Sequence, residues 1–355
     1  MKLASVELIS EINPHPNADK LDLAKVLGYT CIVEKDKYKA GDAVVLIQPD
    51  TVLPNEPWAE FFKKRGSRVK AMKLRGVWSF GIVMPFEDVV DPFFFADQYG
   101  DVKDHIGVDV AHLMGVTKYE APAPQALDAK GPLPFGLNKT DEERYQNFLD
   151  LPFGERVDVT LKVDGQSATY YCKRIPFDNL SDDESEWPVP FYFDKDGVWV
   201  TGVCSRSLEM KPECVNNYTR IDKKYNILEK LLRYCMANNV SLALRGEIYG
   251  NGIQGHANNP HSKLPLDFVA FSVFNFDTNE YENVGSKHYY AVVSGSDYLG
   301  VPRVPTISRQ VLTPELIKHY AEDISEIDGK PFEGVVIKHK SGSFKVINLA
   351  YDERK

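Results

Sequence analysis

Hydrophobic and polar residues alternate in short runs through the first third of the chain. Glycine and proline separate these runs, as in Gly41-Asp42 and Pro54-Asn55-Glu56-Pro57. Because successive side chains of a strand point to opposite faces, this alternation predicts strands, and the frequent turns predict a small all-β barrel. The expected strands are Lys2–Ile9, Leu23–Leu27, Cys31–Val33, Ala43–Ile47 and Phe80–Met84.

The pattern changes after about Pro152, where strand-like runs are mixed with one long helical pattern. From Asn217 to Asn238, apolar residues recur at three- and four-residue steps, which predicts a helix with one apolar stripe. Strands and helices do not follow a strict βαβ rhythm, so we expect an α+β domain rather than a doubly wound sheet. The expected strands are Val157–Val163, Ala168–Cys172, Val198–Val203, Leu242–Tyr249, Phe268–Phe274 and Gly334–Ile337.

Between the two patterns, residues 116–151 are rich in proline, which predicts an extended connector. Near its end, Thr140 precedes three acidic residues. This order predicts a capped helix start, because threonine accepts hydrogen bonds from early helical amides and acidic groups favour the positive end of the helix dipole. The expected organisation is a barrel over 1–115, a connector with a capped helix over 116–151, and an α+β domain over 152–355.

Composition describes an ordinary globular protein of 355 residues with 43% hydrophobic and 26% charged residues. The formal net charge of -9 is not typical of a nucleic-acid-binding protein, but the charge is unevenly distributed. Residues 63–75 form a basic stripe. Such a stripe is able to bind a phosphate backbone even on an acidic protein, although a solvated surface explains it equally well. Seven basic residues and no acidic one occur in this stripe: Lys63, Lys64, Arg65, Arg68, Lys70, Lys73 and Arg75. By contrast, residues 182–190 begin with an acidic run and predict an exposed loop.

Cysteine spacing and hydropathy indicate the cellular compartment in which the protein is expected. The five cysteines form no CxxC pair and no zinc-finger spacing, so free thiols in a reducing compartment are expected. No signal-peptide core and no run of about 18 apolar residues is present, so neither secretion nor membrane insertion is predicted. The sequence therefore predicts a cytoplasmic protein.

The run Thr160-Leu161-Lys162-Val163-Asp164-Gly165 holds the candidate nucleophile. A free lysine titrates near about 10.4 and is a poor nucleophile at neutral pH until its environment disfavours the ammonium form. We expect Lys162 to be largely buried at a strand end, near a cationic metal and other lysines. Asp164 would orient that metal and Gly165 would permit a turn. Alone, Lys-x-Asp-Gly is a weak motif, and a polar β-turn explains it as well.

Five further motifs follow in order, and together they resemble the covalent nucleotidyltransferase superfamily of DNA ligases, RNA ligases and mRNA capping enzymes. They are centred on Arg206, Glu247, Phe271, Glu333 and Lys345. The resemblance covers nearly all of residues 140–355. It implies an α+β adenylylation domain with antiparallel sheets, similar to an ATP-grasp fold. One departure is that many relatives have Lys-x-Lys at the last motif, where this chain has Lys345-Val346-Ile347; Lys338 and Lys340 are candidates for the second lysine.

The resemblance implies a role for each motif residue. Lys162 would form a phosphoramidate with the AMP of ATP, while Lys345 and Lys338 would neutralise the α-phosphate. Asp164 and Glu333 would hold Mg²⁺ or Mn²⁺. The nucleotide contacts would come from Leu161, Arg206, Glu247, Phe271 and Arg144. Read singly, a surface charge is the lesser alternative for Arg206 and Lys338, whereas a core position is the commoner fate of a residue such as Phe271. An unpaired buried carboxylate at Glu247 or Glu333 would be costly, which favours the functional interpretation of these two acids.

Domain order narrows the resemblance. Residues 12–22 and 73–79 look like segments of an OB-fold domain, which binds oligonucleotides with cations and aromatic rings. An N-terminal OB domain before the nucleotidyltransferase domain is similar to the fifth family of polynucleotide RNA ligases. This implies a monomeric enzyme that seals 3′-OH/5′-phosphate nicks in duplex RNA or RNA–DNA hybrids. The alternatives are an ATP-dependent DNA ligase of unusual layout and a non-catalytic RNA-binding protein.

Overall fold

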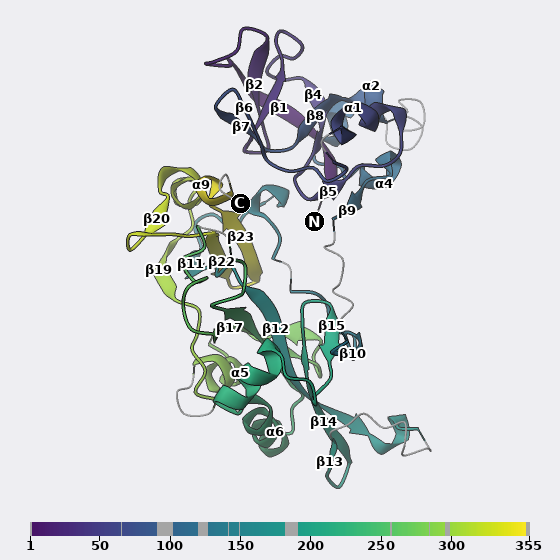
Figure 1. Cartoon of the computed structure of the whole chain (residues 1–355), viewed down its shortest axis with the longest axis vertical. Helices are drawn as coiled ribbons and strands as arrows, with labels where there is room; N and C mark the ends of the chain where they lie inside the picture. The colour runs from purple at the N-terminus through teal and green to yellow at the C-terminus, as the bar shows by residue number, and fades with distance from the viewer. Residues whose placement is uncertain are drawn as a thin grey trace. The chain divides into compact units, whose positions relative to one another are not determined.

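The computed structural model of the chain describes residues 2–64, 66–90, 102–119, 127–140, 142–148, 150–181, 191–255, 258–283, 285–294 and 299–352 (Figure 1). Two compact units are present. The first comprises Met1–Pro122 and Arg144–Leu151, and the second comprises Ala123–Glu143 and Pro152–Lys355. Within the described residues, no helix is long and apolar enough to span a membrane.

The first unit is built on a curled antiparallel sheet of five strands. They are β1 (Ala4–Pro14), β2 (Leu21–Val26), β3 (Tyr29–Glu34), β4 (Ala43–Ile47) and β8 (Ile82–Pro85), in the order β3-β2-β1-β4-β8. The Phe80 amide donates to the Thr30 carbonyl at 2.8 Å, and the Ile32 amide donates to Ser79 Oγ at 2.9 Å. These bonds join the approach to β8 to β3, the opposite edge of the sheet, and so curl it. The expected OB-type barrel is confirmed as a curled half-barrel.

Short elements cover this sheet. Two two-stranded ribbons pair β5 (Thr51–Val52) with β9 (Thr117–Lys118), and β6 (Met72–Leu74) with β7 (Val77–Ser79). The helical pieces are η1 (Pro57–Ala59), α1 (Glu60–Lys63), α2 (Phe86–Val89), η2 (Val102–His105), α4 (Ala111–Met114) and η3 (Tyr145–Asn147). Apolar side chains of the sheet and of these pieces form one buried cluster, which includes Val6, Val45, Phe86 and Met114.

The second unit contains a large and a small antiparallel sheet. The eight strands of the large sheet are β10 (Ala129–Pro132), β15 (Leu208–Met210), β14 (Gly197–Cys204), β12 (Gln166–Pro176), β16 (Leu242–Tyr249), β17 (Asp267–Asn275) and β18 (Glu280–Tyr281), in that order, with β13 (Phe191–Phe193) also paired to β14. The small sheet has the order β19 (Thr306–Val311), β11 (Arg156–Leu161), β22 (Gly334–His339) and β23 (Gly342–Ile347). The strand pairs described in these two sheets are all antiparallel, as the resemblance implies.

The helix predicted over 217–238 is two helices. α5 (Asn217–Tyr225) and α6 (Ile227–Asn238) are separated by Asn226, whose φ of 53° and ψ of 49° are left-handed. Asparagine tolerates this conformation better than most residues, so the chain turns there while both apolar stripes still face the large sheet. Their buried residues pack with those of β12 and β16 in the main core of the unit. Figure 1 shows the two helices beside the large sheet.

The remaining elements of the second unit are short. They are η4 (Phe177–Asn179), α7 (Lys287–Tyr289), the short π-helix η6 (Tyr290–Ser294), α8 (Pro314–Lys318), the short π-helix η7 (His319–Asp323), the ribbon of β20 (Glu326–Ile327) and β21 (Lys330–Pro331), and α9 (Leu349–Asp352). The prediction of a helix that starts at Thr140 is wrong: residues 142–144 are not helical, and the only helical turn nearby in the described residues is the short η3 from Tyr145. The Thr140 hydroxyl lies 2.6 Å from Ser167 Oγ instead. A side-chain partner on β12 thus replaces the expected cap. The predicted acidic loop 182–190 lies outside the described residues.

Candidate active site

Lys162 lies directly after β11, where two backbone hydrogen bonds hold the chain. The Leu161 amide donates to the Pro305 carbonyl at 2.9 Å, and the Lys162 amide donates to the Gly334 carbonyl at 3.0 Å. The second bond extends the pairing of β11 with β22 by one residue. The backbone of Lys162 is therefore held as firmly as that of a strand residue, although Lys162 lies just beyond the end of β11.

The Lys162 ammonium is paired with a carboxylate. Its Nζ lies 2.6 Å from Glu333 Oε2, and the two side chains are 27% and 11% exposed. This differs from the expected environment, a largely buried lysine among other cations, because a carboxylate this close favours the charged ammonium. An ammonium group has no lone pair to donate, so a lysine paired in this way must lose a proton before it acts as a nucleophile.

Glu333 is held opposite Lys162 by the start of β22. A Cβ added at the next residue, Gly334, would lie 2.3 Å from the Val346 carbonyl oxygen on β23. Only glycine permits this approach, because real Cβ atoms do not come so near a backbone oxygen. The close packing of β22 on β23 thus sets the position of the Glu333 backbone.

Asp164 is anchored at its side chain and at its backbone. Tyr351 donates its hydroxyl to Asp164 Oδ2 at 2.9 Å, and Asn259 donates its side-chain amide to the Asp164 carbonyl at 3.0 Å. Asp164 is buried, and burial raises the pKa of the Tyr351 hydroxyl, so this hydroxyl stays protonated and acts as the donor at neutral pH.

Gly165 is required for close packing. It does not appear among the residues with positive φ, so the turn alone does not require glycine there. A Cβ at this position would lie 2.4 Å from the Ile248 carbonyl oxygen and 2.9 Å from Glu247 Cγ. Gly165 therefore lets the chain that carries Lys162 and Asp164 pass directly against β16.

Glu247 lies on β16 opposite Ser167 of β12. Burial raises the pKa of its carboxyl to about 8. The Lys162 ammonium lowers this pKa, whereas the negative charges of Glu333 and Asp164 raise it further. Three carboxyl groups and one lysine therefore form a single electrostatic cluster, and a carboxyl that is largely protonated near neutral pH is able both to donate and to accept hydrogen bonds.

A cavity of about 830 Å³ opens beside this cluster. The predicted residues that line it are Leu161, Lys162, Glu247, Phe271, Lys338 and Lys345. Phe271 is half-buried and packs against an apolar cluster of Val163, Val269 and Val304, so it serves the core and also presents a surface to the cavity. Volumes of this size are typical of small-molecule sites.

Three lysines border the cavity from the small sheet. Lys345 lies on β23 opposite Val336 of β22, while Lys340 is exposed just beyond β22. Lys338 donates its ammonium to the Phe271 carbonyl, and burial lowers the pKa of Lys338 to about 8. Its positive charge is thus present at neutral pH and is lost as the pH rises past about 8.

Two predicted nucleotide contacts are not among the residues that line the cavity. Arg206 is exposed in the turn between β14 and β15. Arg144 is buried and belongs to the segment Arg144–Leu151, which clusters with the first unit. Their roles remain predictions.

Sequence reasoning missed two features of the site. One is an acidic wall of the cavity, formed by Glu142, Glu143, Glu280 and Glu282. The other is the pair of residues that anchor Asp164, namely Asn259 and Tyr351. No spacing or periodicity connects these residues with Lys162, because they come from the segment before β11, from β18 and the loop after it, from a loop at Asn259 and from α9.

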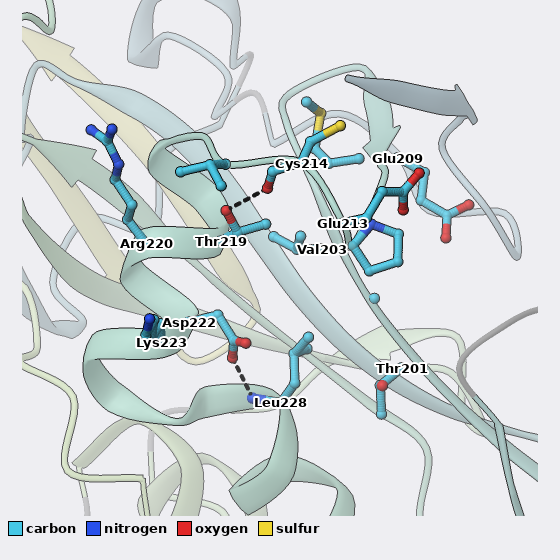
Figure 2. A pocket seen from close by; sticks show the side chains of 14 residues that line it. Thr201, Val203, Glu209, Glu213, Cys214, Thr219, Arg220, Asp222, Lys223 and Leu228 are labelled. Atoms are coloured by element: carbon cyan, nitrogen blue, oxygen red, sulfur yellow. Dashed lines mark hydrogen bonds between the residues drawn. The ribbon is translucent and has the colours of Figure 1, made fainter. Parts of the chain in front are cut away.

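A second cavity of about 390 Å³ lies between α5 and the β14–β15 hairpin (Figure 2). Its polar groups include Thr219, whose hydroxyl donates to the Cys214 carbonyl at 2.8 Å, and Asp222, which accepts the Leu228 amide at 2.8 Å. These groups already bond to the local backbone and stabilise the start of α5 and its turn into α6. None of the predicted site residues lines this cavity, so the chemistry is assigned to the larger one.

Comparison with known proteins agrees with this geometry. A family model described as RNA ligase matches residues 155–349, which is more than half of the 355-residue chain, and an OB-fold domain model matches residues 3–86. Among curated protein sequences, none matches this chain.

Solved structures of Naegleria gruberi RNA ligase resemble the whole chain. A variant with AMP and Mn has a TM-score of 0.76 and 26% identity, and the match covers 100% of this chain and 99% of that one. The ligase with PPi has a TM-score of 0.74 and 28% identity, covering 99% and 98%. Another variant with ATP and Mn has a TM-score of 0.75 and 27% identity, covering 100% and 99%.

Proposed function

The chain belongs to the RNA ligase family, and we propose that it uses ATP to seal 3′-OH/5′-phosphate nicks in duplex RNA or RNA–DNA hybrids through a lysyl-AMP intermediate. The observation that carries the proposal is the position of the Lys162 amine, 2.6 Å from Glu333 at the border of a cavity of nucleotide size. The similar Naegleria gruberi ligase structures with ATP or AMP and Mn support ATP as the nucleotide.

In the first step Lys162 would attack the α-phosphorus of ATP. A nitrogen–phosphorus bond forms, the bond from that phosphorus to the pyrophosphate oxygen breaks, and the amine loses a proton. Glu333 is the proton acceptor that we assign, because its Oε2 lies 2.6 Å from the lysine nitrogen. Glu247 would accept a hydrogen bond from a ribose hydroxyl. Phe271 would stack on the adenine ring, a contact worth about 1–3 kcal/mol.

The next two steps would occur in the same site. AMP passes from Lys162 to the 5′-phosphate of the RNA, and the 3′-OH then attacks that phosphate and displaces AMP. Each step is an in-line displacement at phosphorus, so most of the catalysis comes from positioning and charge stabilisation. The lysines Lys338 and Lys345 would supply positive charge at the α-phosphate, and Leu161, Arg206 and Arg144 remain candidate nucleotide contacts.

The residues of the site fit a divalent cation. No group of three or more metal-ligating side chains occurs within the described ranges, which argues against a metal caged by protein alone. Mg²⁺ commonly takes one or two carboxylates and completes its shell with water and substrate phosphates, and Asp164 and Glu333 supply two carboxylates next to Lys162. When bound, the ion would offset phosphate charge.

The nature of the strand at the nick tests this function. We expect the enzyme to seal nicks whose 3′-OH end is RNA and to seal an all-DNA nick much more slowly, because a ligase specific for RNA would distinguish the ribose 2′-OH, a donor and acceptor that DNA lacks. Matched duplexes that differ only in the sugars before the nick would be compared by gel electrophoresis. Equal sealing of the all-DNA nick would instead support the DNA ligase alternative.

We propose that the first unit contributes RNA binding through the basic stripe. Lys64 Nζ lies 5.6 Å from the centroid of the exposed Phe61 ring, and Lys73 Nζ lies 5.6 Å from that of Trp78. Cations beside aromatic rings suit a nucleic-acid surface. Arg68 stacks on Tyr119 and pairs with Asp50, so its charge is partly satisfied within the unit. Lys63 donates its ammonium to Asn55 Oδ1, and the exposed Lys70 and Arg75 complete the described stripe. Arg65 lies outside the described residues.

Reversing the charges of Lys63, Lys64 and Arg65 should weaken binding to a nicked duplex and leave adenylylation unchanged. Each lost phosphate contact should reduce the salt dependence of binding by a slope of about 1. Filter binding at several salt concentrations would measure this. The matched control reverses three exposed lysines of the same unit, Lys35, Lys37 and Lys39. Equal effects of the two triple variants would show that net charge alone matters.

We further propose that the enzyme acts as a monomer in the cytoplasm. All five cysteines are free, which suits a reducing compartment.

A further inference from the structure

The segment that follows β23 bonds to both residues assigned to the metal, to the backbone of Glu333 and to the carboxylate of Asp164. The Asn348 amide donates to the Glu333 carbonyl at 3.0 Å. Three residues later, in α9, the Tyr351 hydroxyl donates to Asp164 Oδ2 at 2.9 Å. Asp164 and Glu333 are far apart in the sequence, and this one short segment bonds to both of them.

We propose that Tyr351 is a positioning residue, which orients the Asp164 carboxylate for the divalent cation. This inference rests on the proposed function. The hydrogen bond to Oδ2 holds the carboxylate in one rotamer and so fixes the direction in which its two oxygens point. Residues that orient a ligand in this way commonly change metal affinity by about 10- to 100-fold when they are altered.

The support behind Tyr351 is rigid. Tyr351 is 2% exposed, and Asn348 is fully buried. The Asn348 side chain donates to the Ile324 carbonyl at 3.1 Å and accepts the Ala350 amide at 2.9 Å. The first turn of α9 is therefore anchored to the chain before β20. This fixes the backbone position of Tyr351, from which its hydroxyl donates to Asp164.

A purely structural role would satisfy the hydroxyl in another way. Tyr170, also fully buried in this unit, donates its hydroxyl to the Tyr218 backbone carbonyl at 2.9 Å. Tyr351 instead donates to a carboxylate whose backbone carbonyl is held separately by Asn259. Asp164 is thus held at its side chain and at its backbone. Filling the core with a tyrosine does not require such an arrangement, whereas orienting a metal ligand on a loop does.

The test compares Tyr351→Phe with Tyr170→Phe. Each variant loses one buried hydroxyl whose hydrogen bond is 2.9 Å long, but only the first bond ends on Asp164. Mn²⁺ binding in the presence of AMP would be measured by electron paramagnetic resonance, together with the Mn²⁺ dependence of adenylylation and the thermal unfolding of each variant. For Tyr351→Phe we expect weaker Mn²⁺ binding by about 10- to 100-fold. We also expect recovery of the adenylylation rate at excess Mn²⁺, while Tyr170→Phe keeps the wild-type Mn²⁺ dependence.

Three outcomes would overturn the inference: an unchanged affinity for Mn²⁺ in Tyr351→Phe, equal shifts in both variants, or a rate that excess Mn²⁺ does not restore in a variant that is fully folded. These outcomes are distinct from failure of the proposed function itself. In that case the wild-type enzyme would acquire no AMP label, or a variant without Lys162 would keep the label, whatever the state of Tyr351.

Discussion

Replacing Lys162 with alanine should abolish covalent labelling by α-labelled ATP. The wild-type enzyme, incubated with a divalent metal and then denatured, should retain the label in electrophoresis, because a phosphoramidate bond survives unfolding. The alanine variant has no nitrogen at this position to bond to the phosphorus. Its loss is therefore complete rather than partial, and no other step of ligation that starts from ATP should proceed.

The control for this variant must remove an equivalent ion pair elsewhere. Lys130 is 34% exposed and lies 3.0 Å from Glu209, which is 10% exposed, so this pair closely resembles that of Lys162 with Glu333. Lys130→Ala should label normally. Lys162→Arg should fail to label although it keeps the charge opposite Glu333, because a guanidinium stays protonated. Equal labelling of Lys162→Ala and wild type would remove Lys162 from the mechanism.

Strand patterns in the sequence predicted most of the sheets but not where helices begin and end. β16 has the bounds that alternation predicted, Leu242–Tyr249, because its apolar positions face two layers of core. The helix over 217–238 was predicted as one element because both stripes have the same period. The break is a single left-handed residue, Asn226, and periodicity does not register the φ of one residue.

The site was predictable as a set of residues but not as an arrangement. Ordered motifs singled out Lys162, Glu247 and Glu333 as candidates, and the two carboxylates drew attention because burying one without a partner within a hydrophobic strand is costly. These three side chains come together because β11 pairs with β22 and because Gly165 lets the chain after Lys162 pack directly against β16. No local sequence pattern encodes either contact. Tyr351 could not be found in this way, because its partner is 187 positions earlier in the chain.

The same limits explain the environment of Lys162. Sequence reasoning expected burial and neighbouring cations, which would disfavour the ammonium. The structure adds the carboxylate of Glu333, 2.6 Å from the Lys162 amine, which favours the ammonium, while burial lowers the pKa of Lys338 to about 8. A sequence reveals which residue types are present, but the sign of the local field depends on which side chains share the cavity.

Replacing Lys345 with alanine should slow adenylylation by about 100- to 1000-fold, the range seen when one donor to a developing charge is removed. Lys345 lies on β23 at the cavity, in the small sheet that also carries Lys162 at the end of β11. As ATP reacts, negative charge builds on the α-phosphate oxygens, and a half-buried ammonium stabilises this charge more than a solvated one does. Single-turnover labelling at saturating ATP would measure the rate.

Lys340 provides the comparison, because it also borders the cavity but is exposed beyond the end of β22. Solvent screens its charge, so Lys340→Ala should reduce the rate much less than Lys345→Ala does. Thermal unfolding should be nearly unchanged in both variants, since neither side chain belongs to the buried core. If both variants lost equally little of the adenylylation rate, a residue of β22 would have to neutralise the α-phosphate. Lys338 would then take the role assigned to Lys345.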